Sequence, residues 1–217
     1  MSLRPLFRVG IFIALVSVAG ANVRARSGDD NEVITRVRRL VEEVKTASYP
    51  ELKDADIQIK LFNSASDYFQ TRFTVTSFLF RPKLRYLLKV NRRLFDQAAT
   101  EAALRAILAH ELGHILAFKS KARWRLLALV QLPSPVFTAR FERRTDLLAI
   151  ARGYGVGLKA YREWLYQHIP ARKLTEKKRN YFSPAEIDAL LHKMQTQPER
   201  LKSWLKHPPR SLPEIEP

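Results

Sequence analysis

The chain of 217 residues carries 38 Lys and Arg against 21 Asp and Glu, a net charge of +17, with 46% hydrophobic residues and no cysteine. This composition suits one globular domain with its own core and excludes a disordered chain. Without cysteine there can be no disulfide, thiolate metal ligand or cysteine nucleophile. The positive charge favours an anionic partner such as an acidic membrane surface, and because no DNA- or RNA-binding signature accompanies it, nucleic acid is not expected.

The N-terminus has the layout of a secretory signal peptide. Arg4 and Arg8 precede an apolar run at residues 9–21, which ends in Ala-Gly-Ala, a small-x-small cleavage pattern. The run is shorter than a membrane-spanning helix requires. We therefore expect residues 1–21 to be a signal peptide and the protein to be exported, to the periplasm or to the membrane-associated envelope. A retained N-terminal anchor is the alternative, because Arg24 and Arg26 follow the run.

The first half of the remaining chain predicts one helix and three strands. Apolar residues recur at helical spacing over residues 31–48, and residues 56–63 alternate as a strand does. Two further β-rich runs, 72–80 and 84–91, are separated by a turn at 81–83, where Pro82 would also suit an edge position.

The second half predicts helices, so the fold class is α+β. Residues 96–118 are apolar almost all round and predict one long buried helix. The apolar segment 124–137 is broken by two prolines. We expect it to pack in the interior, with contact to a bilayer surface as the alternative. The later segments are a helix at 139–152 stopped by Gly153, a helix at 158–168, a basic connector at 173–179, a helix capped by Ser183, a short helix at 197–206 and an irregular tail.

The stretch LAHELGHILAF, residues 108–118, contains the pattern H-E-x-x-H. His110 and His114 lie one turn apart on a helix, so their imidazoles can share one ion, for which zinc is well suited. Glu111 points to the side of that face and could act as a base toward a water molecule. Gly113 indicates that another segment packs closely there. The alternative is that the two histidines merely pack in a buried helix.

A catalytic zinc ion needs a third protein ligand, and the segment FERRTD supplies candidates. Glu142 and Asp146 lie one turn apart on the same helical face, where two carboxylates repel unless a positive centre is shared. Glu142 as a metal ligand and Asp146 as the acceptor for a ligand histidine would account for both. Otherwise these carboxylates form surface ion pairs, for example Asp146 with Arg143.

The remaining histidines carry less information. His168 and His192 lie near helix ends or on polar faces and are interpreted as surface residues. His207 opens the sequence HPP near the C-terminus, where a tail could fold back and donate a hydrogen bond to an oxyanion. An exposed histidine in a loose tail is the alternative.

Three segments in order resemble the gluzincin metallopeptidases of the HtpX and BepA type, or minigluzincins. They are YLLKVNRRLFDQAATEAALRAILAHELGHILA, FERRTDLLAIARGYG and HPPRSLPEI. The interval of 28 residues from His114 to Glu142 is shorter than is usual in that family, and the tail has no arginine before Ile215. The resemblance implies a small three-stranded sheet whose edge strand packs on a helical zincin core, within a single metallopeptidase-like domain at residues 22–217.

Carried over residue by residue, the resemblance implies that His110, His114 and Glu142 bind one zinc ion. It implies that Glu111 is the catalytic base, that Asp146 supports His110, and that His207 lies near the site. We expect His207, or a tyrosine that the sequence does not identify, to stabilise the oxyanion. The expected activity is zinc-dependent endopeptidase cleavage of protein substrates in the cell envelope, with the substrate extended along an edge strand within 72–91. Two alternatives are a non-catalytic zinc-binding envelope module that contacts lipid or an assembly partner, and a basic nucleic-acid-binding protein. The oligomeric state is not indicated.

Overall fold

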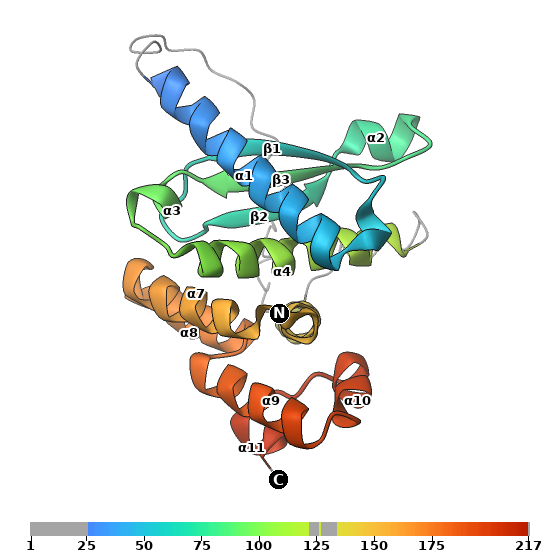
Figure 1. Cartoon of the computed structure of the whole chain (residues 1–217), viewed down its shortest axis with the longest axis vertical. Coiled ribbons are helices and arrows are strands. Elements are labelled where there is room, and N and C mark those ends of the chain that lie inside the picture. The colour runs from blue at the N-terminus through green and yellow to red at the C-terminus, as the bar shows by residue number, and fades with distance from the viewer. Residues whose placement is uncertain (1–25, 122–125, 127–133, 217) are drawn as a thin grey trace, which may run out of the picture.

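The structure is a computed structural model that describes residues 26–121, 126 and 134–216. The expected signal peptide or anchor therefore lies outside the described residues. A small mixed sheet occupies one half of the molecule and helices fill the other, which agrees with the α+β class (Figure 1). Among the described residues, no helix has both the length and the apolar character needed to cross a membrane.

Three strands form the sheet in the order β1-β3-β2. The central strand β3 (Arg85–Asn91) pairs in parallel with β1 (Asp56–Phe62) and antiparallel with β2 (Phe69–Phe73). Tyr86, Leu88 and Val90 of β3 are buried because their common face is covered by helices. Within the described part of the chain, β2 is an edge strand, and its outer edge lies on the side of the helical half.

Two helices cover the inner face of the sheet. Helix α1 (Arg26–Ser48) contacts β1, and α4 (Glu101–Lys119) contacts β2 as well as α1. Val37, Leu40, Val41 and Val44 of α1 join the same buried cluster as the inner face of β3. The amphipathic period seen at 31–48 is thus confirmed, and the helix extends five residues further toward the N-terminus. The apolar face of α1 therefore packs against both α4 and the sheet.

The prediction of a strand at 72–80 is wrong after Phe73. The strand β2 ends at Phe73, and α2 (Val75–Phe80) follows. The Phe78 N–H donates to the Thr74 carbonyl, and this turn brings the rings of Phe73 and Phe78 within 5.6 Å of each other. Val75, Leu79 and Phe80 are exposed, so no buried face enforces the period of a strand there.

The long helix predicted at 96–118 is also wrong at its start. A short helix α3 (Arg93–Asp96) is separated from α4 by a link in which Ala98 has a φ of 52°. The Thr100 hydroxyl then accepts a hydrogen bond from the Ala103 N–H and caps α4. Thr100 followed by Glu101 is a typical start of a helix. The prediction overlooked it because the whole segment 96–118 was interpreted as one apolar helix.

The second half is more helical than predicted. The segment at 173–179, predicted as a connector, is part of a helix, because its Lys, Arg, Leu and Glu residues all favour helix. The tail, predicted to be irregular, contains a short helix with Ile215 buried in a second apolar cluster.

Two predicted helix boundaries are confirmed. Gly153 has a φ of 91° and separates two helices, and the capping box of Ser183 and Glu186 is formed. The elements are η1 (Pro50–Leu52), α6 (Pro135–Ala149), η2 (Ile150–Tyr154), α7 (Gly155–His168), α8 (Ala171–Asn180), α9 (Pro184–Thr196), α10 (Arg200–Lys206) and α11 (Leu212–Ile215).

Most of the apolar segment 124–137 lies outside the described residues, so neither expectation for it is tested as a whole. Leu126 is buried. The break expected at the prolines is seen at the end of the segment, where the Ser134 hydroxyl caps α6 and Pro135 occupies the first turn of that helix.

Candidate metal centre

Helix α4 presents His110 and His114 on one buried face. Their Nε2 atoms lie 3.0 Å apart, and the two side chains are 2% and 10% exposed. The helix is anchored on its other side, where the Tyr49 hydroxyl donates to the Ala109 carbonyl at 2.7 Å. Both imidazoles are therefore held with one ring nitrogen directed to a common point.

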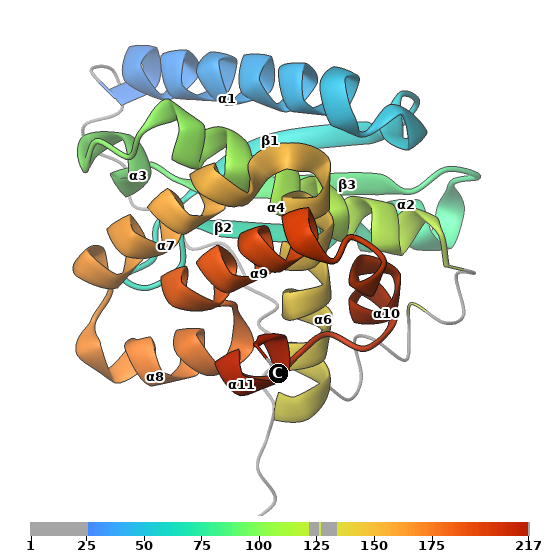
Figure 2. The ribbon, with the colours of Figure 1, turned by 60° about the horizontal axis from the view of Figure 1, so that its bottom comes forward.

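Helix α6 brings Glu142 to that point. Its Oε2 atom lies 3.1 Å from the Nε2 atoms of both His110 and His114. Figure 2 shows α6 running across the direction of α4, and the two helices meet at Gly113. A Cβ atom at this glycine would lie only 2.8 Å from the Cγ2 atom of Thr145. The close packing that Gly113 predicted is thus confirmed, and it is what brings the carboxylate within reach of the histidines.

Asp146 lies behind His110, on the side away from Glu142. Its Oδ1 atom is 2.7 Å from the Nδ1 atom of His110 and also accepts a hydrogen bond from Arg162 at 2.7 Å. Its Oδ2 atom accepts the Phe182 N–H at 3.1 Å. Asp146 is fully buried. These contacts fix the orientation of the His110 ring, which is the role that the sequence suggested for Asp146.

The charges around these histidines favour a positive centre. Burial alone would lower the pKa of the His110 imidazole, but the carboxylates of Asp146 and Glu142 raise it to about 9. Burial raises the pKa of Glu142, and the two histidines together bring it well below its usual range. The pKa of Asp146 is likewise lowered, because Arg162 and His110 outweigh its burial. Both carboxylates are therefore ionised at neutral pH.

Glu111 lies beside the histidines and faces the edge strand. Its Oε2 atom accepts a hydrogen bond from the Thr71 hydroxyl of β2 at 2.6 Å. Glu111 and His110 line the same small cavity, with a volume of about 30 Å³, which is enough for a water molecule. The base predicted from the sequence is thus placed between the histidine pair and β2.

Tyr181 is a residue of the site that we did not single out in the sequence. It precedes the cap of α9 and lines the same cavity as Glu111, with its ring 5.9 Å from that of His110. Burial, reinforced by the negative charge of Glu142, raises the pKa of its hydroxyl well above the ordinary value. The hydroxyl is therefore a proton donor at neutral pH. No sequence signal distinguished this tyrosine from the other six in the chain.

The structure does not bring His207 to the cluster. It is exposed at the end of α10 and lines a separate hollow of about 520 Å³ together with Arg140 and Arg143. His192 is exposed, as predicted for a surface residue, whereas His168 is half-buried and stacks on Trp164. The alternative pairing of Asp146 with Arg143 is not formed, because Arg143 pairs with Glu186 at 2.8 Å.

Aromatic rings extend from the cluster toward the surface. Phe141 lies 5.0 Å from the His114 ring and 6.3 Å from Phe118, measured between ring centroids. Phe118 in turn contacts Phe73 at the end of β2, and Phe141 stacks on Phe137, which is exposed. Phe118 and Phe141 thus place apolar surface against the His114 ring.

The donor set fits a zinc ion. His110, His114 and Glu142 are the one group of three or more possible ligands that converges among the described residues. At zinc bond lengths of about 2.0–2.2 Å, tetrahedral ligands lie about 3.3 Å apart, close to the separations of 3.0–3.1 Å found here. Two imidazoles and one carboxylate also leave a fourth position open, as catalytic zinc sites do.

Residues 80–150, about one third of the chain, match the model of peptidase family M48. The matched segment runs from the end of α2 to the end of α6 and contains all three possible ligands, Glu111 and Asp146. No curated protein and no solved structure matches the chain. The family match and the convergent cluster together support a zinc-dependent metallopeptidase, an enzyme that hydrolyses peptide bonds.

Proposed function

We propose that this chain is a zinc-dependent endopeptidase with the gluzincin-type core of the HtpX and BepA group, acting on protein substrates in the cell envelope. One observation carries the proposal above all. His110, His114 and Glu142 converge on one point, while Glu111 lies between that point and the edge strand β2. A structural zinc site needs four protein ligands and no adjacent base.

His110, His114 and Glu142 would hold one zinc ion, with Asp146 and Arg162 keeping the His110 ring in place. The bound ion would supply Lewis-acid chemistry, polarising the scissile carbonyl and lowering the pKa of water. The short separations mean that the ligands need little movement to reach it.

The edge strand β2 would bind the substrate in an extended conformation. The Thr74 N–H donates to the Arg85 carbonyl, and the Tyr68 carbonyl accepts from the Asn91 N–H, so the even-numbered residues of β2 pair with β3. In an antiparallel pair the intervening residues direct their N–H and C=O groups the other way. Phe69, Thr71 and Phe73 therefore offer main-chain groups at the outer edge, where a peptide could add as a further strand.

The expectation for the substrate strand is wrong over most of its range. We expected an edge strand within 72–91, but β3 is central and α2 occupies 75–80. The edge strand is β2, and Thr71 in its middle contacts Glu111 directly. A peptide bound along β2 would pass beside the catalytic base, with the aromatic rings of Phe73 and Phe118 next to it.

Glu111 would act as the general base. Its carboxylate accepts a proton from the attacking water and later returns it to the nitrogen of the leaving amine. The Thr71 hydroxyl positions this carboxylate by donating to one of its oxygens, which leaves the other oxygen to face the water. The buried surroundings of Glu111 strengthen each of these interactions.

The negative charge that develops on the carbonyl oxygen needs a hydrogen-bond donor. Tyr181 is better placed for this than His207, because it lines the same cavity as His110 and Glu111, whereas His207 lines another hollow. We therefore assign the Tyr181 hydroxyl to this role. His207 could take part only if the C-terminal segment moved.

The envelope location rests on the sequence of residues 1–21, which predicts export. We propose that residues 22–217 form the exported domain and that its net positive charge favours an anionic membrane surface as a further partner. The rival function is a zinc-binding module without turnover, which would keep the same three ligands.

The test that separates these functions is the Glu111→Gln variant. It keeps the size and hydrogen-bonding capacity of the side chain but cannot accept a proton. We expect it to bind zinc as the parent chain does and to lose hydrolysis of unfolded casein. Zinc bound without hydrolysis by the parent chain itself would favour the module, and full activity of the variant would exclude the mechanism.

A further inference from the structure

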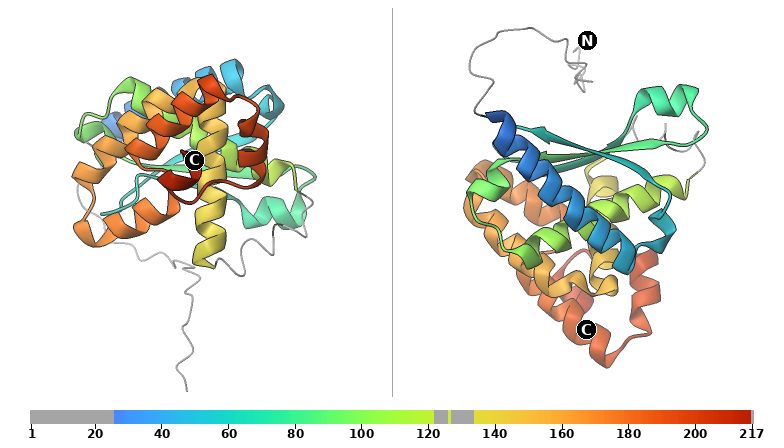
Figure 3. Two further views of the ribbon diagram at one scale, coloured as in Figure 1. Left: turned by 90° about the horizontal axis from the view of Figure 1, so that it is seen from below. Right: turned by 45° about the horizontal axis from the view of Figure 1, so that its top comes forward.

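Helix α2 exposes apolar side chains that no part of the proposed reaction uses. Val75, Leu79 and Phe80 are 67%, 58% and 81% exposed. They occupy a helix of only six residues that projects from one end of the sheet (Figures 1 and 3). Single exposed apolar residues are ordinary in soluble proteins, but three within six residues form a contiguous patch.

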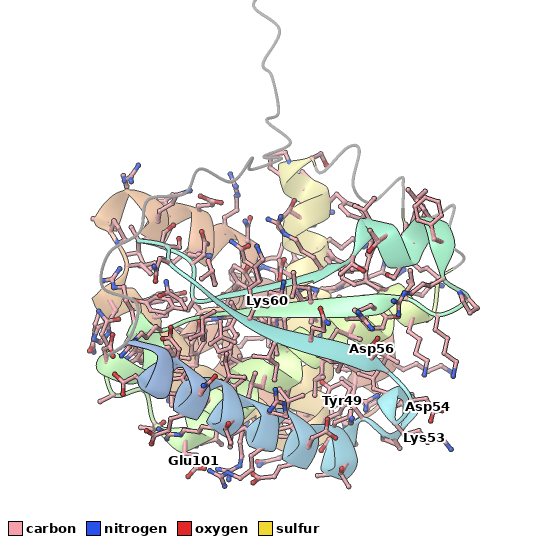
Figure 4. The ribbon with its side chains drawn as sticks, turned by 90° about the horizontal axis from the view of Figure 1, so that it is seen from above. Tyr49, Lys53, Asp54, Asp56, Lys60 and Glu101 are labelled. Carbon is pink, nitrogen blue, oxygen red and sulfur yellow. The ribbon has the colours of Figure 1, made fainter. Side chains whose placement is uncertain are left out.

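Positive side chains surround this patch. Arg72, just before it, and Arg81 and Lys83, just after it, are exposed. Lys83, Lys119 and Lys121 also line a hollow of about 410 Å³ that begins where α2 ends, and Asp54 is the one acidic residue among the described residues of its lining. Figure 4 shows Asp54 and Asp56 at this end of the molecule, and Asp56 is paired with Arg85. The local balance is therefore positive.

We infer that α2, through Val75, Leu79 and Phe80, docks this end of the protein onto the surface of a membrane that contains anionic lipid. Apolar side chains flanked by lysine and arginine match the two layers of such a surface, the acyl boundary and the negatively charged headgroups. A protein partner with an apolar groove would not require the flanking cations. The inference is independent of the proposed peptidase activity, because none of the three residues belongs to the site.

The absence of cysteine allows a direct test in the full chain, since a single introduced cysteine can be labelled alone. We would attach an environment-sensitive fluorophore to Phe80→Cys and, as a matched control, to Val156→Cys, because Val156 is 74% exposed at the start of α7. The probes are vesicles of phosphatidylcholine alone and of phosphatidylcholine mixed with phosphatidylglycerol. We expect a blue shift and protection from iodide at position 80, with the mixed vesicles only, and no change at position 156.

A second measurement uses unlabelled variants. The full chain with Val75→Ser, Leu79→Ser and Phe80→Ser should bind the mixed vesicles at least about tenfold more weakly, because the apolar contribution is lost. Lys83→Gln should weaken binding by about fivefold at low salt and less at high salt. Equal shifts at positions 80 and 156, binding unchanged in the triple variant, or a shift at position 80 that depends on protein concentration without vesicles would each overturn the inference.

Discussion

Gly113 of α4 packs directly against Thr145 of α6, so closely that a Cβ atom on the glycine would lie 2.8 Å from the threonine Cγ2. The ligands His114 and Glu142 flank this contact in the sequence. A methyl group at position 113 would push α6 away from α4 and separate the carboxylate from the histidines. We therefore expect Gly113→Ala to weaken zinc affinity by at least about tenfold, although alanine favours helix by about 1 kcal/mol.

The matched control is the pair Gly113→Ala with Thr145→Ser. Serine removes the methyl group that clashes and keeps the hydroxyl that donates to the Phe141 carbonyl. Competition with a chromogenic chelator measures the zinc affinity of each variant. Affinity restored in the double variant would confirm that the clash is responsible. Parent-like affinity in Gly113→Ala alone would contradict this account of the helix contact.

The hydrogen bond from Thr71 to Glu111 should matter for turnover rather than for metal binding. Thr71→Val removes the hydroxyl while keeping the shape, so the Glu111 carboxylate loses its positioning donor. We expect kcat to fall by about tenfold, corresponding to about 1.4 kcal/mol, with zinc content unchanged. Thr71→Ser should keep most of the activity. A fall of the same size in Thr71→Ser would mean that kcat depends on the methyl group of Thr71 and not on its hydroxyl.

Substitutions of Tyr181 and His207 should affect turnover differently. If the Tyr181 hydroxyl steadies the oxyanion, Tyr181→Phe should lower kcat by about one hundredfold and leave KM and zinc content nearly unchanged. His207→Ala should have little effect on kcat, since His207 lines a different hollow. Steady-state kinetics on one fluorogenic peptide distinguish the two. The reverse pattern would restore the role that the sequence first suggested for the C-terminal histidine.

Asp146 should contribute to stability as well as to metal binding. Asp146→Asn leaves Arg162 buried without an ionic partner, so we expect a loss of about 3–5 kcal/mol in the free energy of unfolding. The folded-state pKa of Asp146 is depressed, so its contribution is complete above about pH 4 and is lost as the pH falls further. Urea unfolding at pH 7 and pH 3 tests this. The difference between parent and variant should shrink at pH 3, and an equal difference at both values would contradict the assignment.

The chemistry of the site could be predicted from local spacing, because i and i+4 residues of a helix share a face wherever the helix lies. His110 with His114, and Glu142 with Asp146, follow this rule, and Gly113 indicated where their helices meet. The partner of Glu111 could not be predicted, because Thr71 is distant in the sequence and has no distinguishing pattern. A tyrosine was expected as the alternative to His207, but Tyr181 could not be chosen among the seven tyrosines for the same reason.

The errors in the fold have related physical causes. Residues 75–80 carry β-forming side chains, but no covering face enforces a strand, so a local turn at Thr74 decides their structure. Conversely, residues 96–118 are so uniformly apolar that the period could not reveal the break at 97–100. The helix at Ala171–Asn180 was missed because it has little apolar surface and depends on intrinsic propensity. The spacing of apolar residues predicted the type of element only where one face of that element is clearly covered by the core.

The central claim is that His110, His114 and Glu142 bind the zinc ion of a peptidase. The most direct measurement is the metal content of the purified chain by mass spectrometry, beside His110→Ala and, as a control, His192→Ala at the exposed histidine of α9. We predict one zinc ion per chain in the parent and in His192→Ala, and almost none in His110→Ala. A parent chain without stoichiometric zinc, or a His110→Ala variant that retains it, would contradict the account.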